Sequence, residues 1–344
     1  MAERQSYRAF NDVINETLKE YKNKNITKEK GCFRGKSNEK VLTDEFSQKN
    51  SEIPAMLFGG IVDKWKDIQR SAFKYKPHIY AFNHIASSQT ACVNLFIPIL
   101  TSGKANEILK ESGIAPNDFG RIDSDSLYKG FQFEFGVGKL LENKSGVVTD
   151  SDVAIAYINK NKNEERCLWL IEHKLTETDF THCGGYRSKS KVHEENPQYK
   201  ENCRTCSLEE ILRDPKLCYY HAVSKYKYWD IMNKGGKDFF KGEYDKSAGC
   251  PFRKEMNQLW RNQLLAMSLE KQIPNVYKHV CFSVVKHPDN PSLDKSIEDY
   301  KRLTNDSPKF SVFTSLDLIR AAEKDPELKE WIAWYKDIYH IVKD

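Results

Sequence analysis

The chain of 344 residues lacks several features that would assign it to a special class of protein. It has no apolar run of about 18 residues, the minimum for a helix that spans a membrane. Residues 1–25 are amphipathic and charged, unlike the apolar centre of a secretory signal. Its nine cysteines are an odd number and, without such a signal, favour free thiols or metal ligands over a disulfide framework. We therefore expect a cytoplasmic protein with no membrane segment.

The composition is typical of a globular protein with a substantial core. Hydrophobic residues make up 39% and aromatic residues 12% of the chain, and both values exclude a disordered protein. The length allows one large domain or two modest ones. A net charge of +5 is a mild basic bias, which is compatible with a polyanionic partner but does not demonstrate one.

The N-terminal third of the chain is predicted to be mainly helical. Apolar residues recur at spacings of three and four in residues 5–22 and again in 54–73, and residues 42–46 are expected to add a further helix. A buried helix is predicted to begin after Ser87 or Ser88 and to end near Pro98. Its polar residues, such as Asn94, are expected to be hydrogen-bonded within the core.

The stretch 149–176 is predicted to form two strands joined by a polar turn. Residues 152–158 alternate in character, and residues 166–175 are a nearly continuous apolar run, which favours a hairpin in a buried sheet. Residues 130–136 alternate strictly, with phenylalanines on one face and Gln132 and Glu134 on the other. We expect these three segments to form an antiparallel meander, and residues 118–128 to form a loop.

The C-terminal part is predicted to alternate between strands and helices. Strands are expected at 277–285 and 310–314, and helices at 292–303 and 316–322, with a final amphipathic helix after Pro326. This spacing suggests parallel pairing. The fold class is therefore α/β (α+β), a mixed sheet covered by helices.

Three ionisable residues fall on one face of the predicted hairpin. Glu172 and Lys174 are two residues apart in one strand, Asp152 opens the other strand, and His173 points to the opposite face. Carboxylate oxygens suit Mg²⁺, which can activate a water, while a lysine can orient or deprotonate that water or stabilise negative charge. The alternative is a Glu–Lys ion pair beside a solvated Asp. Because an unpaired charge in an apolar strand is unfavourable, we prefer the functional interpretation.

The pattern Asp152, then Glu172-x-Lys174 across a hairpin, resembles the PD-(D/E)XK signature of restriction-endonuclease-like nucleases. The segments HIASSQTACVNLF, FQFEF and MNQLWRNQLLA also resemble a bacterial group of restriction endonucleases in that superfamily. The resemblance covers roughly residues 80–320. It implies a restriction-endonuclease-like core in which the Asp and the Glu bind a divalent metal and the Lys serves the nucleophilic water.

The resemblance also implies supporting residues and leaves one choice open. Ser151 stands where the signature has proline, so Asp150 rivals Asp152 as the first ligand; both face the same side by strand phase, and we prefer Asp152. Glu134 corresponds to an additional acidic residue of the superfamily. Gln258 and Arg261 resemble polar residues that support the site or hold a phosphate, although both also fit an exposed helix face.

A second predicted metal site comes from the cysteines of residues 176–224. Cys203 and Cys206 have a metal-knuckle spacing, and Cys218 follows; the fourth ligand is either Cys183 or His221. Sulfur-rich sites of this kind are structural Zn²⁺ sites, and an iron–sulfur cluster, which some relatives hold with four cysteines, is the rival. Free thiols in a polar loop are the third alternative. Another possible ligand, farther along the chain, is Cys250.

Together these features predict a Mg²⁺-dependent DNA endonuclease of the restriction or defence type. The expected organisation is a helical region at 1–80, a nuclease core at 81–320 with a cysteine-rich insertion at about 176–224, and a C-terminal helix at 321–344. DNA phosphates are expected to meet the N-terminal helices and the basic run 186–191. The alternatives are a non-catalytic, zinc-stabilised nucleic-acid-binding protein and a DNA-repair exonuclease of the same fold. Enzymes of this class often act as dimers, so a homodimer is possible.

Overall fold

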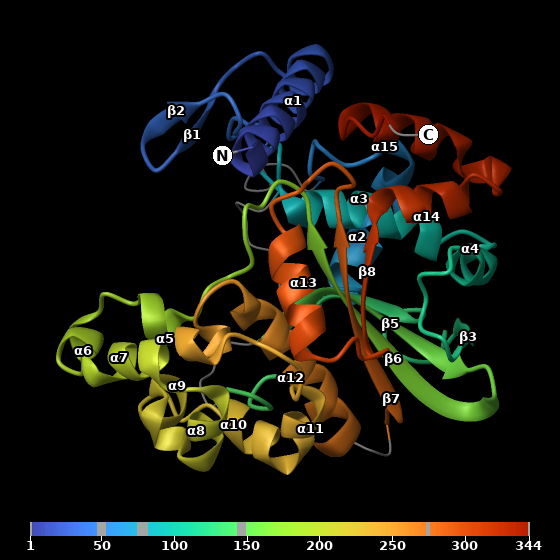
Figure 1. Cartoon of the computed structure of the whole chain (residues 1–344). Helices are drawn as coiled ribbons and strands as arrows, with labels where there is room; N and C mark the ends of the chain where they lie inside the picture. The colour runs from blue at the N-terminus through green and yellow to red at the C-terminus, as the bar shows by residue number, and fades with distance from the viewer. Residues whose placement is uncertain (1, 47–52, 74–81, 143–148, 273–275, 343–344) are drawn as a thin grey trace.

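A mixed six-stranded sheet forms the centre of the computed structural model, which describes residues 2–46, 53–73, 82–142, 149–272 and 276–342. The strand order is β3-β5-β6-β7-β8, and β4 pairs with β5 alongside β3 (Figure 1). The bounds of these strands are β3 (Phe119–Ile122), β4 (Phe131–Gly136), β5 (Asp150–Asn159), β6 (Lys162–Lys174), β7 (His279–Lys286) and β8 (Phe310–Thr314).

The strand pairing confirms most of the predicted topology. β4, β5 and β6 form the expected antiparallel meander, and β6, β7 and β8 are parallel. The prediction of a loop at 118–128 was wrong, because β3 pairs antiparallel with the far end of β5. Only four residues long, β3 is too short to give a clear period-2 pattern.

Two hydrophobic cores lie on opposite faces of the sheet. In β6, Cys167, Trp169 and Ile171 enter the first core, while Leu168 and Leu170 enter the second, so both faces of this strand are buried. The first core is covered by α1 (Ala2–Asn25), α2 (Val62–Ser71), α3 (Ser88–Leu100), α4 (Ala105–Glu111), α14 (Ser315–Ala322) and α15 (Lys329–Ile338). Helices of the second core include α8 (Leu208–Arg213), α10 (Tyr228–Ile231), α12 (Met256–Gln272) and α13 (Asp294–Leu303).

Helix α3 begins as predicted and is buried along most of its length. The Ser87 side chain accepts a hydrogen bond from the backbone N–H of Thr90, and the helix runs through Pro98. Asn94 is a satisfied core residue: its side chain accepts from the N–H of Phe58 and donates to the Met56 carbonyl and the Tyr339 hydroxyl. It therefore joins α3 to two other parts of the first core.

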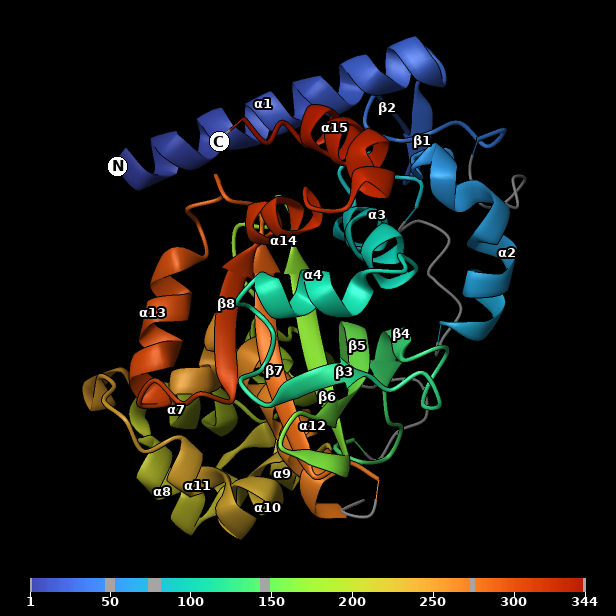
Figure 2. The same cartoon turned by 90° about the vertical axis from the view of Figure 1, so that its right-hand side faces the viewer.

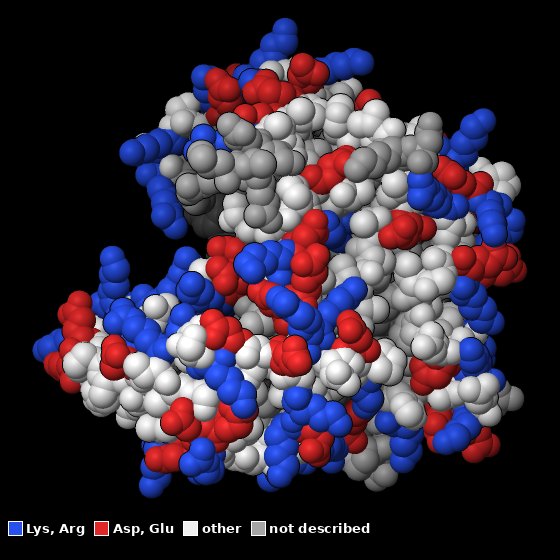
Figure 3. Space-filling model, in the orientation of Figure 1, with Lys and Arg blue, Asp and Glu red and all other residues white. Residues whose placement is uncertain are grey.

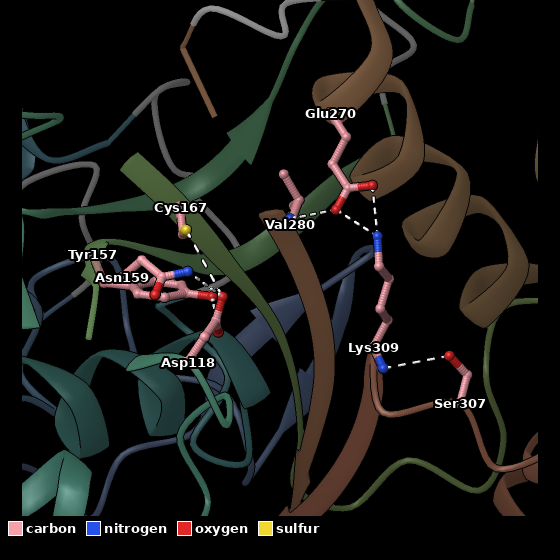
Figure 4. Close-up of polar contacts among 8 residues, drawn as sticks. All are labelled: Asp118, Tyr157, Asn159, Cys167, Glu270, Val280, Ser307 and Lys309. Carbon is pink, nitrogen blue, oxygen red and sulfur yellow. Dashed lines mark hydrogen bonds and ion pairs between the residues drawn. The ribbon is translucent and has the colours of Figure 1, made fainter. Parts of the chain in front are cut away.

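Helix α12 is held against the sheet at its C-terminal end by Glu270. The carboxylate accepts from the backbone N–H of Val280 in β7 at 2.7 Å and from Lys309 Nζ at 2.7 Å (Figure 4). The same figure shows Asp118, which accepts hydrogen bonds from Tyr157 and Asn159 beside β3. Because Glu270 anchors one end of α12, the other end is directed along the sheet towards the end of β6.

Helices α1 and α15 lie side by side above the sheet (Figure 2). The link after α1 contains a short antiparallel ladder, β1 (Gly31–Phe33) and β2 (Lys36–Asn38). The helix expected at 42–46 is not formed; Val41 instead bridges to His84, and residues 44–46 make a turn. Within the described residues, no helix is long and apolar enough to cross a membrane.

The segment 184–253 is built from short helices and turns. They are α5 (Gly184–Arg187), α6 (Lys191–Glu194), α7 (Gln198–Thr205), α9 (Tyr219–Ala222), α11 (Lys237–Phe239), the π-turn η3 (Met232–Gly236) and the 3₁₀ turns η2 (Pro215–Leu217), η4 (Lys246–Ala248) and η5 (Pro251–Arg253). Two further 3₁₀ turns are η1 (Gly59–Ile61) and η6 (Pro326–Leu328). Figure 1 shows the helices of this segment gathered beside α12, on the far side of the sheet from α14.

The alternation in β4 breaks at Glu134. Phe131 and Phe133 enter the first core, as predicted, but Phe135 enters the second. Glu134 has a φ of 49°, in the left-handed region that non-glycine residues rarely adopt. This backbone turn is the reason that the three phenylalanines do not share one face, and strained residues of this kind are often found at functional sites.

Candidate active site

Three carboxylates lie in one row across β4, β5 and β6. Val153 pairs with Phe133 in β4 and with Ile171 in β6. The residue before it in β5, Asp152, therefore stands between Glu134 and Glu172. The row is at the end of the sheet where α12 and the loop after β6 meet. It exists because the two ladders that flank β5 keep their register up to this point.

Asp152 is held by the backbone of the neighbouring strand. Its Oδ2 accepts a hydrogen bond of 2.6 Å from the backbone N–H of His173. Burial, followed by the charges of Glu172 and Glu134, raises the pKa of Asp152 well above its ordinary value. The carboxylate is therefore unfavourable unless a cation stands beside it.

Glu172 is buried, and both of its carboxylate oxygens accept hydrogen bonds from side chains. Its Oε1 accepts from Lys174 Nζ at 2.8 Å and from Gln258 Nε2 at 2.6 Å, and its Oε2 accepts from Asn262 Nδ2 at 2.8 Å. Gln258 and Asn262 are one turn apart on α12, so both amides face the same carboxylate. Gln258 Oε1 also accepts from the backbone N–H of Thr181, which joins Glu172 to the loop after β6.

Lys174 lies between the carboxylates and an open cavity. The cavity has a volume of about 470 Å³ and is lined by Tyr7, Lys174, Thr176, Glu177, Thr178, Asp179 and Thr181. Burial by itself lowers the pKa of Lys174, but the charges of Glu172, Glu177 and Asp152 together raise it above its ordinary value. Lys174 is therefore an ammonium ion. Tyr7 of α1 closes one side of the cavity by donating to the Thr176 carbonyl at 2.8 Å.

A fourth acid, Asp150, lies beside the row, and the charges of these carboxylates raise one another's pKa values. Burial and the charge of Asp150 raise the pKa of Glu134 to about 7, against a smaller opposing effect of its hydrogen bond from Gln89 Nε2. Burial and the charge of Glu172 raise the pKa of Asp150 to about 6. Four carboxylates beside one lysine give this place an excess of acidic groups.

The remaining predicted residues divide between this site and other places. Gln258 contacts Glu172 as expected of a supporting residue. Arg261 interacts with the side chains of Tyr228 and Tyr220, although its charge also lowers the pKa of Asp150. His173 is on the opposite face as predicted, where burial and the charge of Lys174 lower its pKa to about 3.

Sequence reasoning missed Asn262 and Tyr7 as members of the site. Asn262 stands four residues after Gln258, and this helical spacing was a signal that could have identified it. Gln89 is another polar residue of α3, for which a hydrogen bond within the core was expected, and its amide donates to Glu134. Tyr7 fits the apolar face of an ordinary amphipathic helix, and nothing in the sequence points to its contact with Thr176.

The predicted cysteine site lies in the helical segment that follows. Cys183, Cys203 and Cys218 are buried, Cys206 is half-buried, and all are free thiols. The alternative ligand His221 is directed to Asp230, with 3.8 Å between Nδ1 and Oδ1. As the side chains stand, no group of three or more His, Cys, Asp or Glu residues in the described part of the chain is arranged to hold a metal ion.

Comparisons with known proteins give one result. A family model, REase-ARP, described as "Restriction Endonuclease associating with ARP", matches residues 60–340. Searches of the curated proteins and of the solved structures found no match. The matched range contains the whole sheet, β3 to β8, and all four carboxylates of the site.

Proposed function

The chain belongs to the restriction endonuclease family REase-ARP, which implies a nuclease that acts on DNA, and we propose that it is a Mg²⁺-dependent endonuclease with its active site at Asp152, Glu172 and Lys174. The observation that supports this most strongly is the environment of Glu172. A buried carboxylate is bonded by a lysine and two amides and stands beside a second carboxylate, that of the half-buried Asp152. A structural ion pair needs only the lysine, so the extra acids require another explanation.

The donor set fits Mg²⁺ by its chemistry. Mg²⁺ binds hard oxygen ligands and usually takes one or two carboxylates, with waters and substrate phosphates in the other positions. The hydrogen bonds among the described residues occupy Glu172 Oε1 twice but Oε2 once, and they engage Oδ2 but not Oδ1 of Asp152. Asp152 and Glu172 would hold the ion through the remaining lone pairs. When bound, Mg²⁺ supplies positive charge to a phosphoryl oxygen and acidifies a water.

The residues of the chain have separate tasks in this proposal. Lys174, a buried ammonium at the cavity wall, orients the attacking water and stabilises negative charge that develops on the phosphate. Gln258 and Asn262 fix the Glu172 carboxylate, and Tyr7 and Thr176 border the space where the phosphate would enter.

The molecular surface has room for DNA at this place. On the face shown in Figure 3, a hollow separates the part that carries α1, β1 and β2 from the part that carries α5 to α9. Exposed basic side chains stand on both parts: Arg34 and Lys36 in the first, Arg187, Lys189 and Lys191 in the second. Since phosphate contacts position a duplex, these side chains would hold DNA over the cavity that Lys174 lines.

The test is cleavage of supercoiled plasmid and of linear DNA, each with Mg²⁺ and with EDTA. We expect the wild type to nick or linearise the circle only with Mg²⁺, and Asp152→Asn and Lys174→Met to lose at least about 100-fold in rate, as for removal of a group that stabilises the transition state. Lys162→Met, in the same strand but at the surface, is the matched control and should cut normally.

Three outcomes would contradict the proposal. Cleavage by Lys174→Met at the wild-type rate would show that Lys174 is not part of the active site. Cleavage in EDTA would show that the reaction does not require Mg²⁺. Degradation of linear DNA with the circular plasmid left intact would show that the activity of these residues is that of an exonuclease.

A further inference from the structure

Four buried cysteines come together beside the N-terminal end of α12. They are Cys183, Cys203, Cys218 and Cys250, and each is between 6% and 8% exposed. Cys183 precedes α5, Cys218 precedes α9, Cys250 precedes η5, and Cys203 lies in α7. Four thiols from four separate turns of one small segment are more than a hydrophobic core of this size requires.

Backbone contacts bring these four turns together around Cys203. The N–H of Cys250 donates to the Cys203 carbonyl at 3.0 Å, and Arg253 Nη1 donates to the same oxygen at 3.2 Å. A Cβ on Gly249 would stand 2.7 Å from that carbonyl, so glycine is needed for this approach. Cys203 and Cys250 are thus adjacent although 47 residues separate them in the sequence.

The other two cysteines are joined to the same place through their neighbours. Asn202 Nδ2 donates to the carbonyl of Leu217, the residue before Cys218, at 3.0 Å. The N–H of Gly184, the residue after Cys183, donates to the Tyr220 hydroxyl at 2.7 Å. Tyr220 belongs to α9, the helix that Cys218 precedes, so these bonds close a ring from α5 through α9 to α7.

The electrostatics agree with this geometry. Burial and then the Cys183 and Cys218 thiols raise the pKa of Cys203. Burial and then the Cys203, Cys218 and Cys183 thiols raise the pKa of Cys250 well above its ordinary value. The neighbouring thiols therefore oppose ionisation of Cys203 and Cys250, a repulsion that a bound cation reverses.

Cys206, the partner of Cys203 in the metal-knuckle spacing, is placed less favourably. It is half-buried, and its sulfur lies 4.0 Å from the hydroxyl of the adjacent Thr205. The tertiary structure thus favours Cys250 over Cys206 as the fourth ligand.

We propose that Cys183, Cys203, Cys218 and Cys250 form a four-thiolate centre for one Zn²⁺ ion, and that Cys206 is not a ligand. Zn²⁺ prefers four thiolates in a closed structural site. Binding requires the thiols to lose their protons and to draw together around the ion. The centre would connect η5 to α5, α7 and α9. The turn η5 directly precedes α12. Since α12 carries Gln258 and Asn262, the zinc would support the position of the two amides that hold Glu172.

The test begins with the metal content of the full chain, purified without chelators under anaerobic conditions. We expect about one zinc per chain, as for a structural site with one ion. Single Cys→Ser variants at the four positions should lose most of this zinc and unfold at lower temperature. Cys206→Ser, three residues from Cys203, is the matched control and should keep both zinc and thermal stability.

A second measurement avoids dependence on how well the serine variants fold. Wild-type protein stripped of metal and then given Co²⁺ should show the strong sulfur-to-cobalt charge-transfer absorption of a tetrahedral thiolate site, and Cys206→Ser should show the same spectrum. A wild-type protein without bound zinc, or loss of zinc in Cys206→Ser but not in Cys250→Ser, would overturn the proposal. Iron with inorganic sulfide would overturn the zinc assignment. Because zinc content is measured without DNA, failure of this proposal is distinct from failure of the nuclease assignment.

Discussion

Replacement of Glu134 by Gln is expected to reduce the pH dependence of stability in metal-free protein. Glutamine keeps the size of the side chain but cannot ionise. In the wild type, burial and the charge of Asp150 raise the pKa of Glu134 to about 7, from the ordinary value of 4.5 for an exposed glutamate. The folded protein therefore holds a proton on this carboxyl at pH values where the unfolded chain has released it.

The sign of the effect follows from this proton. A raised carboxyl pKa contributes stability that is fully present below about pH 4.5 and is lost as the pH rises through about 7. The shift corresponds to about 3 kcal/mol at 1.36 kcal/mol per pKa unit. Without metal, the wild type should thus lose about 3 kcal/mol through Glu134 between pH 4.5 and pH 8.

Glu134→Gln should remove most of that loss. The charge of Glu134 also raises the pKa of Asp152, so the substitution reduces the loss at Asp152 as well. The variant should therefore gain stability over the wild type as the pH rises, by about 3 kcal/mol at pH 8 relative to their difference at pH 4.5.

The assay is urea unfolding at a series of pH values in EDTA, with the free energy of unfolding extrapolated to water. Glu107→Gln, an exposed glutamate on α4, is the control and should follow the wild-type curve. The reasoning is refuted if wild type and Glu134→Gln lose stability in parallel between pH 4.5 and pH 8.

Three other predictions concern the residues around the site. Asn262→Ala removes a hydrogen bond to Glu172 and should weaken Mg²⁺ binding by about 10- to 100-fold in calorimetry. The surface variant Asn233→Ala is the control and should bind Mg²⁺ as the wild type does. Equal affinity in the wild type and both variants would contradict the supporting role of Asn262. Mg²⁺ should raise the melting temperature of the wild type but not of Asp152→Asn, and an equal rise in both would place the metal elsewhere. Asn94→Ala leaves the buried hydrogen-bonding partners of Asn94 unsatisfied and should lower the free energy of unfolding, measured with urea, by about 3 kcal/mol. A loss below about 1 kcal/mol would show that water satisfies these partners in the variant.

The parts of the fold that could be predicted are those in which one segment carries its own signal. The long helix α1, the capped helix α3 and the strands β5 and β6 follow from hydrophobic spacing that depends only on the element itself. The four-residue strand β3 and the ladder of β1 and β2 were missed because so few residues cannot establish a period. The turn of β4 at Glu134 was missed because a positive φ is imposed by the surroundings, and glutamate gives no sign of it.

For the candidate site, the sequence by itself determined which residues share a face. The period of two in a strand places Glu172 and Lys174 on one face and His173 on the other, and this holds for any strand with this order of residues. Asp152 joins Glu172 through the register of β5 with β6.

Only the tertiary structure decided which groups complete the site. Asn262 reaches Glu172, Gln89 reaches Glu134 and Cys250 reaches Cys203 because helices from distant parts of the chain pack on the sheet. The free energy of that packing comes from apolar side chains elsewhere in each helix, so the polar contacts that result leave no local pattern in the sequence.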